Sequence, residues 1–135
     1  MKLSEVMKRS TFIRGNSKVI FSINYSDVAT SGDVADINRY VGTVIEKMPK
    51  KSMLLLLDVR KLCVNGDTNE HLKEMFELYS SYFKASAVVV DENNENEIKD
   101  LIKTLGFTKM IIYTNPELAR KSLFGGDNPG RYIAQ

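Results

Sequence analysis

The chain has 135 residues, 43% of them hydrophobic and 27% charged, which fits one globular domain and excludes an intrinsically disordered chain. With 19 Lys and Arg against 17 Asp and Glu, the net charge of +2 gives no large basic field and argues against general nucleic-acid binding. One Cys and one His exclude a disulfide framework or a Cys/His zinc site within the chain, so no metal or cofactor is expected.

The first predicted unit is a β-hairpin. Thr11 to Arg14 is a short extended run, and Gly15-Asn16-Ser17 is a turn cluster in which Gly and Asn tolerate positive φ. Lys18 to Asn24 then alternates with the period of two that is typical of a strand. Two extended runs joined by three turn residues predict antiparallel pairing.

In the sequence, an apolar strand is predicted between two amphipathic helices. After Ser31-Gly32-Asp33, apolar residues recur at spacings of three and four until Pro49 ends the helix. Ser52 to Asp58 is a nearly continuous apolar run, which is typical of a strand buried on both faces. The second helix is expected to begin near Asp67, which has the spacing of a capping box with Glu70.

A further strand and helix follow. The β-branched residues of Ala85 to Val90 favour a strand. The third helix is expected to begin in the acidic stretch from Asp91 to Glu97, because acidic residues stabilise the positive end of the helix dipole. Gly106 with Phe107 has the pattern of a glycine C-cap.

The C-terminal part predicts one more strand and one more helix. Lys109 to Tyr113 is the strand, and Thr114-Asn115-Pro116-Glu117 supplies a cap residue, a first-turn proline and a first-turn acid for the helix. Gly125-Gly126 stops it. Residues 127–135 are expected to form a loose tail.

The order of elements is β-β-α-β-α-β-α-β-α, which predicts an α/β fold in a single domain over residues 1–126. We expect a mixed, mostly parallel sheet of about five strands with helices on both faces and right-handed crossovers. The strands at 53–58, 85–90 and 109–113 should be parallel, with 18–24 beside one of them; the sequence leaves the strand order open. Six residues are predicted to be buried: Ile37, Leu55, Leu57, Val88, Val90 and Ile111.

Nothing in the sequence predicts membrane insertion. The N-terminal segment lacks the apolar run of a signal peptide, and the longest strongly apolar run, Met53 to Leu57, is far shorter than the ~20 residues that span a bilayer. We therefore expect a cytoplasmic protein, and a lone Cys63 suits a reducing cytosol.

Catalytic motifs are scarce. There is no phosphate-binding glycine loop and no GxSxG nucleophile elbow. His71, the single imidazole, is interpreted as a solvated surface residue. Cys63 is interpreted as a small apolar residue in a loop that packs back on the sheet, although the nearby Arg60 and Lys61 leave a reactive thiolate open.

Asp58 ends the buried strand, and open α/β sheets place ligand sites at such carboxyl ends. Response-regulator receivers phosphorylate an Asp at a strand end, but they also need an acidic pair after the first strand, where this chain offers only Asp27. The preferred interpretation of Asp58 is a hydrogen-bonding residue that closes the following loop. The acidic run from Asp91 to Asp100 lacks the spacing of an EF-hand loop and is interpreted as a solvated helix start.

The segment LLLLDVRKLCVNGDTNEHL, residues 54–72, resembles the signature of STAS domains, which include bacterial anti-sigma-factor antagonists and cytosolic domains of sulfate transporters. Leu54 to Leu57 match the apolar strand of that signature, and Asp58, Leu62 and Val64 fill the next positions. The resemblance covers roughly residues 11–124 and implies the same fold.

The family signature continues with Asp-Ser-(small)-Gly, whose Ser receives phosphate from an anti-sigma kinase and thereby switches partner binding. An ungapped alignment places Gly66, Asp67 and Asn69 at the family Asp, Ser and Gly, so the resemblance implies that the standard switch is missing. Thr68 could take phosphate only if the loop were shifted. Asp67 could act as a fixed negative charge or serve merely as a helix N-cap. A looser set of STAS-like bacterial proteins also lacks the phosphoserine.

Three functions remain open. The preferred hypothesis is a non-enzymatic, regulatory protein-interaction module that docks a partner, by resemblance an anti-sigma or kinase-like regulator, through the loop 58–70 and the exposed side of the second helix. The alternative is a small-molecule or lipid sensor that binds near the same loop. An enzyme would require Cys63, Asp58 or His71 to converge. The candidate docking or switch residues are Asp58, Arg60, Asp67, Thr68 and Asn69.

Overall fold

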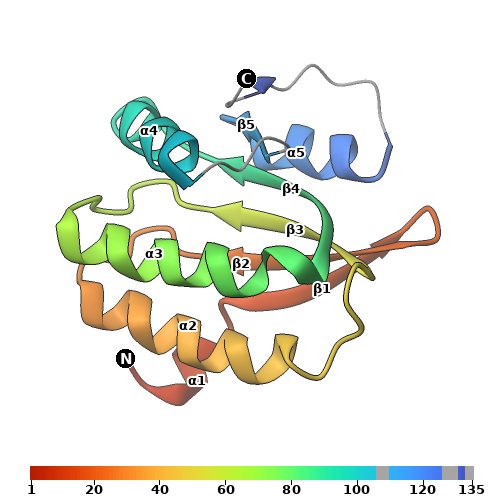
Figure 1. The fold of residues 1–135 in the computed structure, drawn as a ribbon, viewed down its shortest axis with the longest axis horizontal. Coiled ribbons are helices and arrows are strands. Elements are labelled where there is room, and N and C mark those ends of the chain that lie inside the picture. The colour runs from red at the N-terminus through yellow and green to blue at the C-terminus, as the bar shows by residue number, and fades with distance from the viewer. Residues whose placement is uncertain (106–109, 126–130, 133–135) are drawn as a thin grey trace.

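The structure, a computed structural model, describes residues 1–105, 110–125 and 131–132 (Figure 1). A single sheet runs through the molecule with helices on either side of it. The helices are α1 (Leu3–Met7), α2 (Ser31–Ile45), α3 (Gly66–Tyr79), the short 3-10 helix η1 (Ser80–Tyr82), α4 (Glu95–Leu105) and α5 (Pro116–Leu123). The strands are β1 (Ser10–Gly15), β2 (Lys18–Asn24), β3 (Met53–Asp58), β4 (Phe83–Val89), β5 (Met110–Tyr113) and β6 (Arg131–Tyr132).

The strands lie in the sheet in the order in which they occur in the chain, β1-β2-β3-β4-β5-β6. The β2–β3, β3–β4 and β4–β5 pairs are parallel, while β1 pairs antiparallel with β2. The predicted parallel core is therefore confirmed, and the strand at 18–24 lies beside β3. The two residues of β6 fall in the segment predicted to be a loose tail, yet they pair antiparallel with β5.

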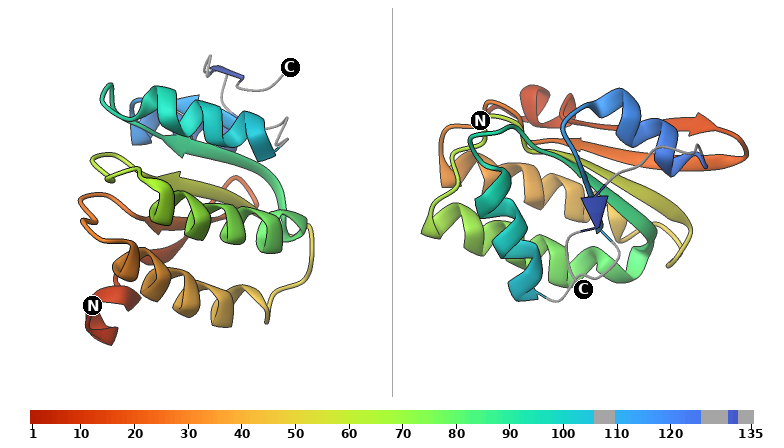
Figure 2. Two further views of the ribbon diagram at one scale, coloured as in Figure 1. Left: turned by 60° about the vertical axis from the view of Figure 1, so that its left-hand side comes forward. Right: turned by 90° about the horizontal axis from the view of Figure 1, so that it is seen from above.

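The three crossover helices α2, α3 and α4 all cover one face of the sheet, and α5 covers part of the other (Figures 1 and 2). Because side chains alternate along β3, Leu55 and Leu57 enter the larger core while Leu54 and Leu56 enter the smaller one under α5. This explains why the sequence of β3 is apolar throughout. Within the described residues, no helix has the length and apolar character needed to cross a membrane.

Five of the six residues predicted to be buried are buried: Ile37, Leu55, Leu57, Val88 and Val90. The prediction for Ile111 is wrong, since this side chain is only half-buried and lies on the side of the sheet that α5 covers incompletely. Its neighbour Ile112 points to the opposite face and is 1% exposed in the larger core.

The hairpin between β1 and β2 is tighter than predicted. Gly15 belongs to β1 and pairs with Lys18, so the turn consists of Asn16 and Ser17 alone, with φ of 50° and 62°. Positive φ at both residues is typical of a type I′ turn, which matches the twist of the flanking strands. Gly15 matters for a different reason: a Cβ there would lie 3.2 Å from the ring of Phe124, which would have to shift by a few tenths of an ångström.

Other differences are small. The sequence pattern missed α1, because five residues with Val6 as the one buried side chain give no helical period. Helix α2 ends at Ile45, ahead of Pro49. The predicted C-cap at Gly106 and Phe107 and the predicted stop at Gly126 lie outside the described residues.

Truncating a side chain of the larger core should destabilise the domain. We expect Leu55→Ala to lower the free energy of unfolding by about 2–4 kcal/mol through lost burial and the cavity left behind. The matched control is Leu118→Ala, since Leu118 is 42% exposed and its loss should stay within about 0.5 kcal/mol. Urea denaturation of both variants measures the difference, and equal losses would contradict this packing.

The amides of β1 should exchange with solvent in alternation. Gly15 and Lys18 close a two-residue turn, and the closing pair of such a turn is hydrogen-bonded. Because hydrogen-bonded pairs alternate along an antiparallel ladder, the odd-numbered residues of β1 bond to β2. The bond from the N–H of Asn24 to the carbonyl of Arg9 fits this register. We expect slow exchange for Thr11 and Ile13 and fast exchange for Phe12 and Arg14. Amide exchange followed by NMR measures this, and equal protection at all four positions would contradict the register.

Candidate functional site

The predicted site lies where the parallel strands β2, β3 and β4 end, and Figure 1 shows the three loops at the same edge of the sheet. The carboxyl ends of parallel strands form the usual ligand edge of an α/β fold. The loop after β3 is joined to both of its neighbours: Tyr25 N–H donates to the carbonyl of Asp58, and Val59 N–H donates to the carbonyl of Val89. The sheet ladder thus continues into the loop and fixes where it starts.

Asp58 and Arg60 form a two-pronged ion pair within this loop. The carboxylate of Asp58 accepts from Nε of Arg60 at 3.0 Å, from its NH2 nitrogen at 2.7 Å and from its backbone N–H at 3.1 Å. The hydrogen bond to Asp58 raises the pKa of the Arg60 guanidinium above its ordinary value, and the charges of Asp58, Asp27 and Asp91 add to this effect. The side chain of Asp58 is only 15% exposed. The expectation that Asp58 closes its loop is therefore confirmed.

Asn94, which is not among the residues predicted from the sequence, holds the same loop from the other side. Its side chain is buried at 5% exposure, and its Nδ2 donates to the carbonyl of Val59 at 2.7 Å and to that of Leu62 at 3.4 Å. Its Oδ1 accepts from the N–H of Asp91 at 3.2 Å. One amide side chain thus ties the loop after β3 to the loop after β4. The sequence signal was weak, because Asn94 is one of three Asn residues in an acidic, polar stretch, and Asn is common in exposed turns.

Asp91 completes this connection. Its carboxylate accepts from the N–H groups of Asn93 at 2.8 Å and of Asn94 at 3.1 Å, and also from the N–H of Lys61. Lys61 adopts a φ of 59°, an uncommon conformation that this bond helps to hold. The interpretation of the acidic run as a solvated helix start is thus incomplete, because its first residue is a structural acceptor.

The start of α3 differs from the prediction. Helix α3 begins at Gly66, and Asn65 is its N-cap, with the side-chain oxygen accepting from the N–H of Thr68 at 3.0 Å. Asp67 is therefore an exposed first-turn residue, and its prediction as the cap is wrong. Asn65 takes the cap position because its backbone is extended there and its side chain can reach back to the third helical N–H.

The other predicted switch residues are less accessible than Asp67. Thr68 is 1% exposed, which places its side chain inside the domain. Asn69 is half-buried, and its Oδ1 is a buried atom without a hydrogen-bond partner in the described part of the chain. The structure therefore does not present the five predicted residues as one surface cluster. It pairs Asp58 with Arg60 in the loop and places Asp67 on the surface of α3.

In the described part of the chain, neither Cys63 nor His71 forms a hydrogen bond or ion pair with Asp58, whose carboxylate bonds to Arg60. Cys63 is exposed, so the interpretation that it packs back on the sheet is wrong. His71 lies beside Glu74, with Nδ1 and Oε2 3.9 Å apart, and its backbone carbonyl accepts from Asn38 at 2.9 Å. Among the described residues, no group of three or more His, Cys, Asp or Glu side chains could hold a metal ion.

A depression of about 330 Å³ lies next to the loop, and its lining is predominantly polar. It includes Cys63 and contains neither Asp58 nor His71. The residues that line it are Lys61, Leu62, Cys63, Val64, Asp91, Asn93, Asn94 and Glu97.

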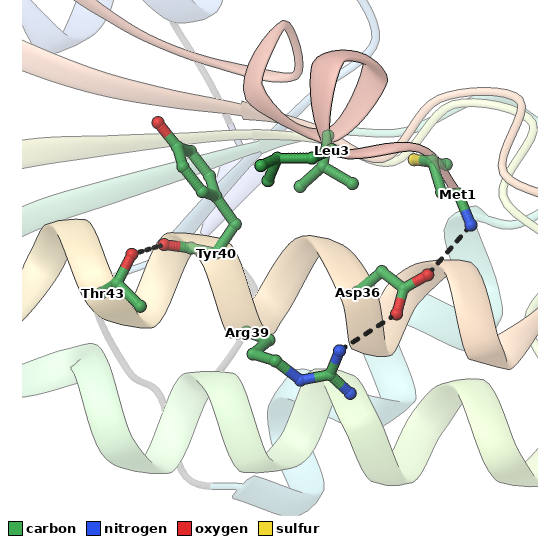
Figure 3. A pocket seen from close by; sticks show the side chains of 7 residues that line it. Met1, Leu3, Asp36, Arg39, Tyr40 and Thr43 are labelled. Atoms are coloured by element: carbon green, nitrogen blue, oxygen red, sulfur yellow. Dashed lines mark hydrogen bonds and ion pairs between the residues drawn. The ribbon is translucent and has the colours of Figure 1, made fainter.

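A second depression, of about 350 Å³, lies between α1 and α2, away from the predicted residues (Figure 3). Leu3 and Tyr40 form apolar walls, and Asp36 accepts from the Met1 ammonium at 3.1 Å and from Arg39 at 3.4 Å. The hydrogen bond to Asp36 raises the pKa of that ammonium above its ordinary value. These contacts attach α1 to the outer side of α2.

The outer side of α3 carries a row of acidic side chains. Asp67, Glu70, Glu74 and Glu77 are all exposed and recur at spacings of three and four, so they lie on one side of the helix. The opposite side of α3 is anchored in the larger core by Leu72, Met75 and Phe76. We call the four acidic residues the α3 acidic row. Of these four residues only Asp67 was predicted from the sequence, because the shared side of the other three is recognised only once the buried side of α3 is known.

Comparisons of the chain with protein-family models, with curated proteins and with solved structures found no match.

Removing Asn94 should loosen the loop after β3. We expect Asn94→Ala to lower the free energy of unfolding by about 1–3 kcal/mol, because three hydrogen bonds of a buried side chain are lost. The carbonyl of Leu62 loses a donor and the N–H of Asp91 loses an acceptor, while the carbonyl of Val59 keeps only the N–H of Leu62. The control is Asn93→Ala, since Asn93 is exposed and its side chain should contribute within about 0.5 kcal/mol. Chemical denaturation compares the two, and an Asn94→Ala variant as stable as Asn93→Ala would contradict the assigned role.

Proposed function

We propose that the chain is a non-enzymatic protein-interaction module that docks a partner on the loop 58–70 and the exposed side of α3. The observation that carries this proposal is the α3 acidic row. Four carboxylates on one side of a helix form a field that attracts a basic surface and repels an acidic one. The resemblance of residues 54–72 to STAS domains independently supports a regulatory role at the same loop.

The base of this surface is rigid. The Asp58–Arg60 pair and the Asn94 bonds fix the loop through contacts made inside the domain. The apolar side of α3 fixes the helix in the core. A surface that is already ordered loses little conformational entropy on binding, which favours recognition without a change of shape.

The charge on this surface is constitutive in our proposal. Asp67 is exposed in the first turn of α3, at the positive end of the helix dipole, in the position where the resemblance places the phosphorylated Ser. Thr68, the other residue considered for phosphate, is 1% exposed and would have to leave the domain interior to reach a kinase. Both placements support a module that lacks the phosphoserine switch.

Ion pairs within the domain neutralise little of the charge of the α3 acidic row. In the described part of the chain the one ion pair that includes a member of the row is Glu74 with His71, at 3.9 Å. A pair at that separation on an exposed helix is weak and depends on the protonation of His71. The remaining carboxylates are available to a partner's Lys and Arg side chains.

The alternative function, a small-molecule sensor, is favoured by one observation. The depression beside Cys63 lies next to the same loop and has a volume of about 330 Å³, at the lower end of the usual range for ligand pockets. Its polar lining suits a small polar ligand better than a lipid. A thermal-shift screen of polar metabolites tests this: a ligand whose stabilising effect is lost in Asn93→Ala or Glu97→Gln would support it.

The main proposal is tested by removing the charges and leaving the shape. We expect Glu70→Gln, Glu74→Gln and Glu77→Gln, combined in one variant, to weaken partner binding by about tenfold or more. The matched control is Glu5→Gln, Glu46→Gln and Glu92→Gln, which removes the same charge from exposed positions elsewhere. Proteins captured from the native cell by the wild type are identified by mass spectrometry, purified and measured directly against both variants.

The expected partner binds the wild type and the control variant alike, and it binds the variant with three Glu→Gln changes in the α3 acidic row more weakly. Added salt should lower its affinity for the wild type, because salt screens the charges. Equal affinity for all three proteins would contradict docking on α3. Cross-linking of the complex gives a second readout, since contacts should fall on residues 58–77.

A further inference from the structure

The edge of the sheet at β1 has backbone groups without a neighbouring strand. In the described part of the chain β1 pairs with β2 alone, and Figures 1 and 2 show no strand on its other side, with α1 at its N-terminal end. By the alternation of antiparallel pairing, the N–H and C=O groups of Ser10, Phe12 and Arg14 point away from β2. These groups match the spacing of an added strand.

An apolar side chain lies along the same edge. Phe12 is 40% exposed, and its ring centroid lies 4.9 Å from that of Phe21 on β2, on the face that the crossover helices cover. Neighbouring strands are spaced by about 4.8 Å. A strand added beside β1 would therefore bring one of its own side chains against the exposed side of the Phe12 ring.

The charge at this edge has one sign. Lys8, Arg14 and Lys18 are exposed, and there is no Asp or Glu from Lys8 to Ser26. Arg9 in the same stretch is occupied, since its guanidinium donates to the carbonyls of Asn24 at 3.1 Å and Ser26 at 2.8 Å. Within the residues that the structure describes, none of Lys8, Arg14 and Lys18 forms an ion pair.

These charges decide which occupant fits. A second copy paired through the same edge would bring two basic edges together, each with Arg14 on β1 and Lys8 and Lys18 on either side of the strand in sequence, and charges of like sign repel each other. A segment rich in Asp and Glu is favoured by the same charges. We propose that the β1 edge binds an acidic, extended peptide segment of another protein by strand addition, with a large apolar side chain of that segment against Phe12.

The test uses synthetic eight-residue peptides, labelled with fluorescein, in which Glu alternates with Val and one central apolar position is Phe or Ile. We expect saturable binding to the wild type, measured by fluorescence anisotropy. Phe12→Ala and Arg14→Gln should each weaken it. Arg14→Pro should weaken it about tenfold beyond Arg14→Gln, because proline also removes an N–H that points at the added strand. Leu118→Ala and Lys47→Gln are matched controls for apolar area and charge.

NMR of the wild-type protein gives a readout that does not depend on the variants folding. Bound peptide should slow the exchange of the Phe12 and Arg14 amides, while the amides of Thr11 and Ile13, already bonded to β2, should change little. Melting temperatures of all variants show which of them retain the fold.

Five results would overturn the proposal. The first is the absence of binding by every peptide, and the second is unchanged amide exchange at Phe12 and Arg14 in the presence of saturating peptide. The third is equal affinity of Arg14→Gln and Arg14→Pro for the peptide, which would indicate charge attraction alone. The fourth is a concentration-dependent dimer, seen by sedimentation and lost in Arg14→Pro, which would assign the edge to a second copy. An oligodeoxythymidine probe that competes equally well with the peptides would likewise assign it to nucleic acid.

Discussion

Burial of β3 on both faces is the constraint on which the rest of the structure depends. Leu54 and Leu56 enter one core and Leu55 and Leu57 the other, so neither face of the strand can be left to water. The strand must also be paired along both sides, because its backbone groups are inaccessible to solvent. Strands β2 and β4 supply that pairing, and helices are required on both faces.

The same burial explains the character of the candidate site. Polar groups of the loop that follows β3 are largely shielded from water and therefore need hydrogen-bond partners within the domain. Asp58 and Arg60 satisfy each other, and Asn94 satisfies two loop carbonyls at once. The result is a fixed loop that leads into α3. Asp58, which looks functional by its position, is therefore already hydrogen-bonded within the domain, while Asp67 in the first turn of α3 is exposed.

The distribution of charge is uneven although the net charge is small. The outer side of α3 is acidic, and the edge at β1 is basic over the stretch from Lys8 to Ser26. A net charge of +2 conceals both regions because they nearly cancel. The two surfaces belong to different parts of the molecule, and we propose that they bind partners of opposite charge. Our two proposals thus assign separate roles to them, and each can fail without the other.

By itself the sequence determined the fold class, the parallel pairing of the central strands and most of the core. The physical reason is that periods of two and of 3.6 residues record which side of an element is buried, as in the alternation of β2 and the apolar stripe of α2. Candidate residues on the loop 58–70 were found because strand ends and helix starts can be placed from such patterns.

Tertiary structure alone decided the strand order, the burial of Thr68, the identity of the α3 cap and the role of Asn94. The strand order, the burial of Thr68 and the role of Asn94 depend on contacts between segments far apart in the chain: the side-chain amide of Asn94 bonds to Val59, 35 positions earlier. The α3 cap is a local contact between Asn65 and Thr68, which the extended backbone at Asn65 decides. The local periodicity of a sequence does not record which distant segment a side chain will contact. Ile111 and Ile112 show the same limit, since both are apolar and adjacent, and only the uneven cover of the two sheet faces makes one half-exposed and the other buried.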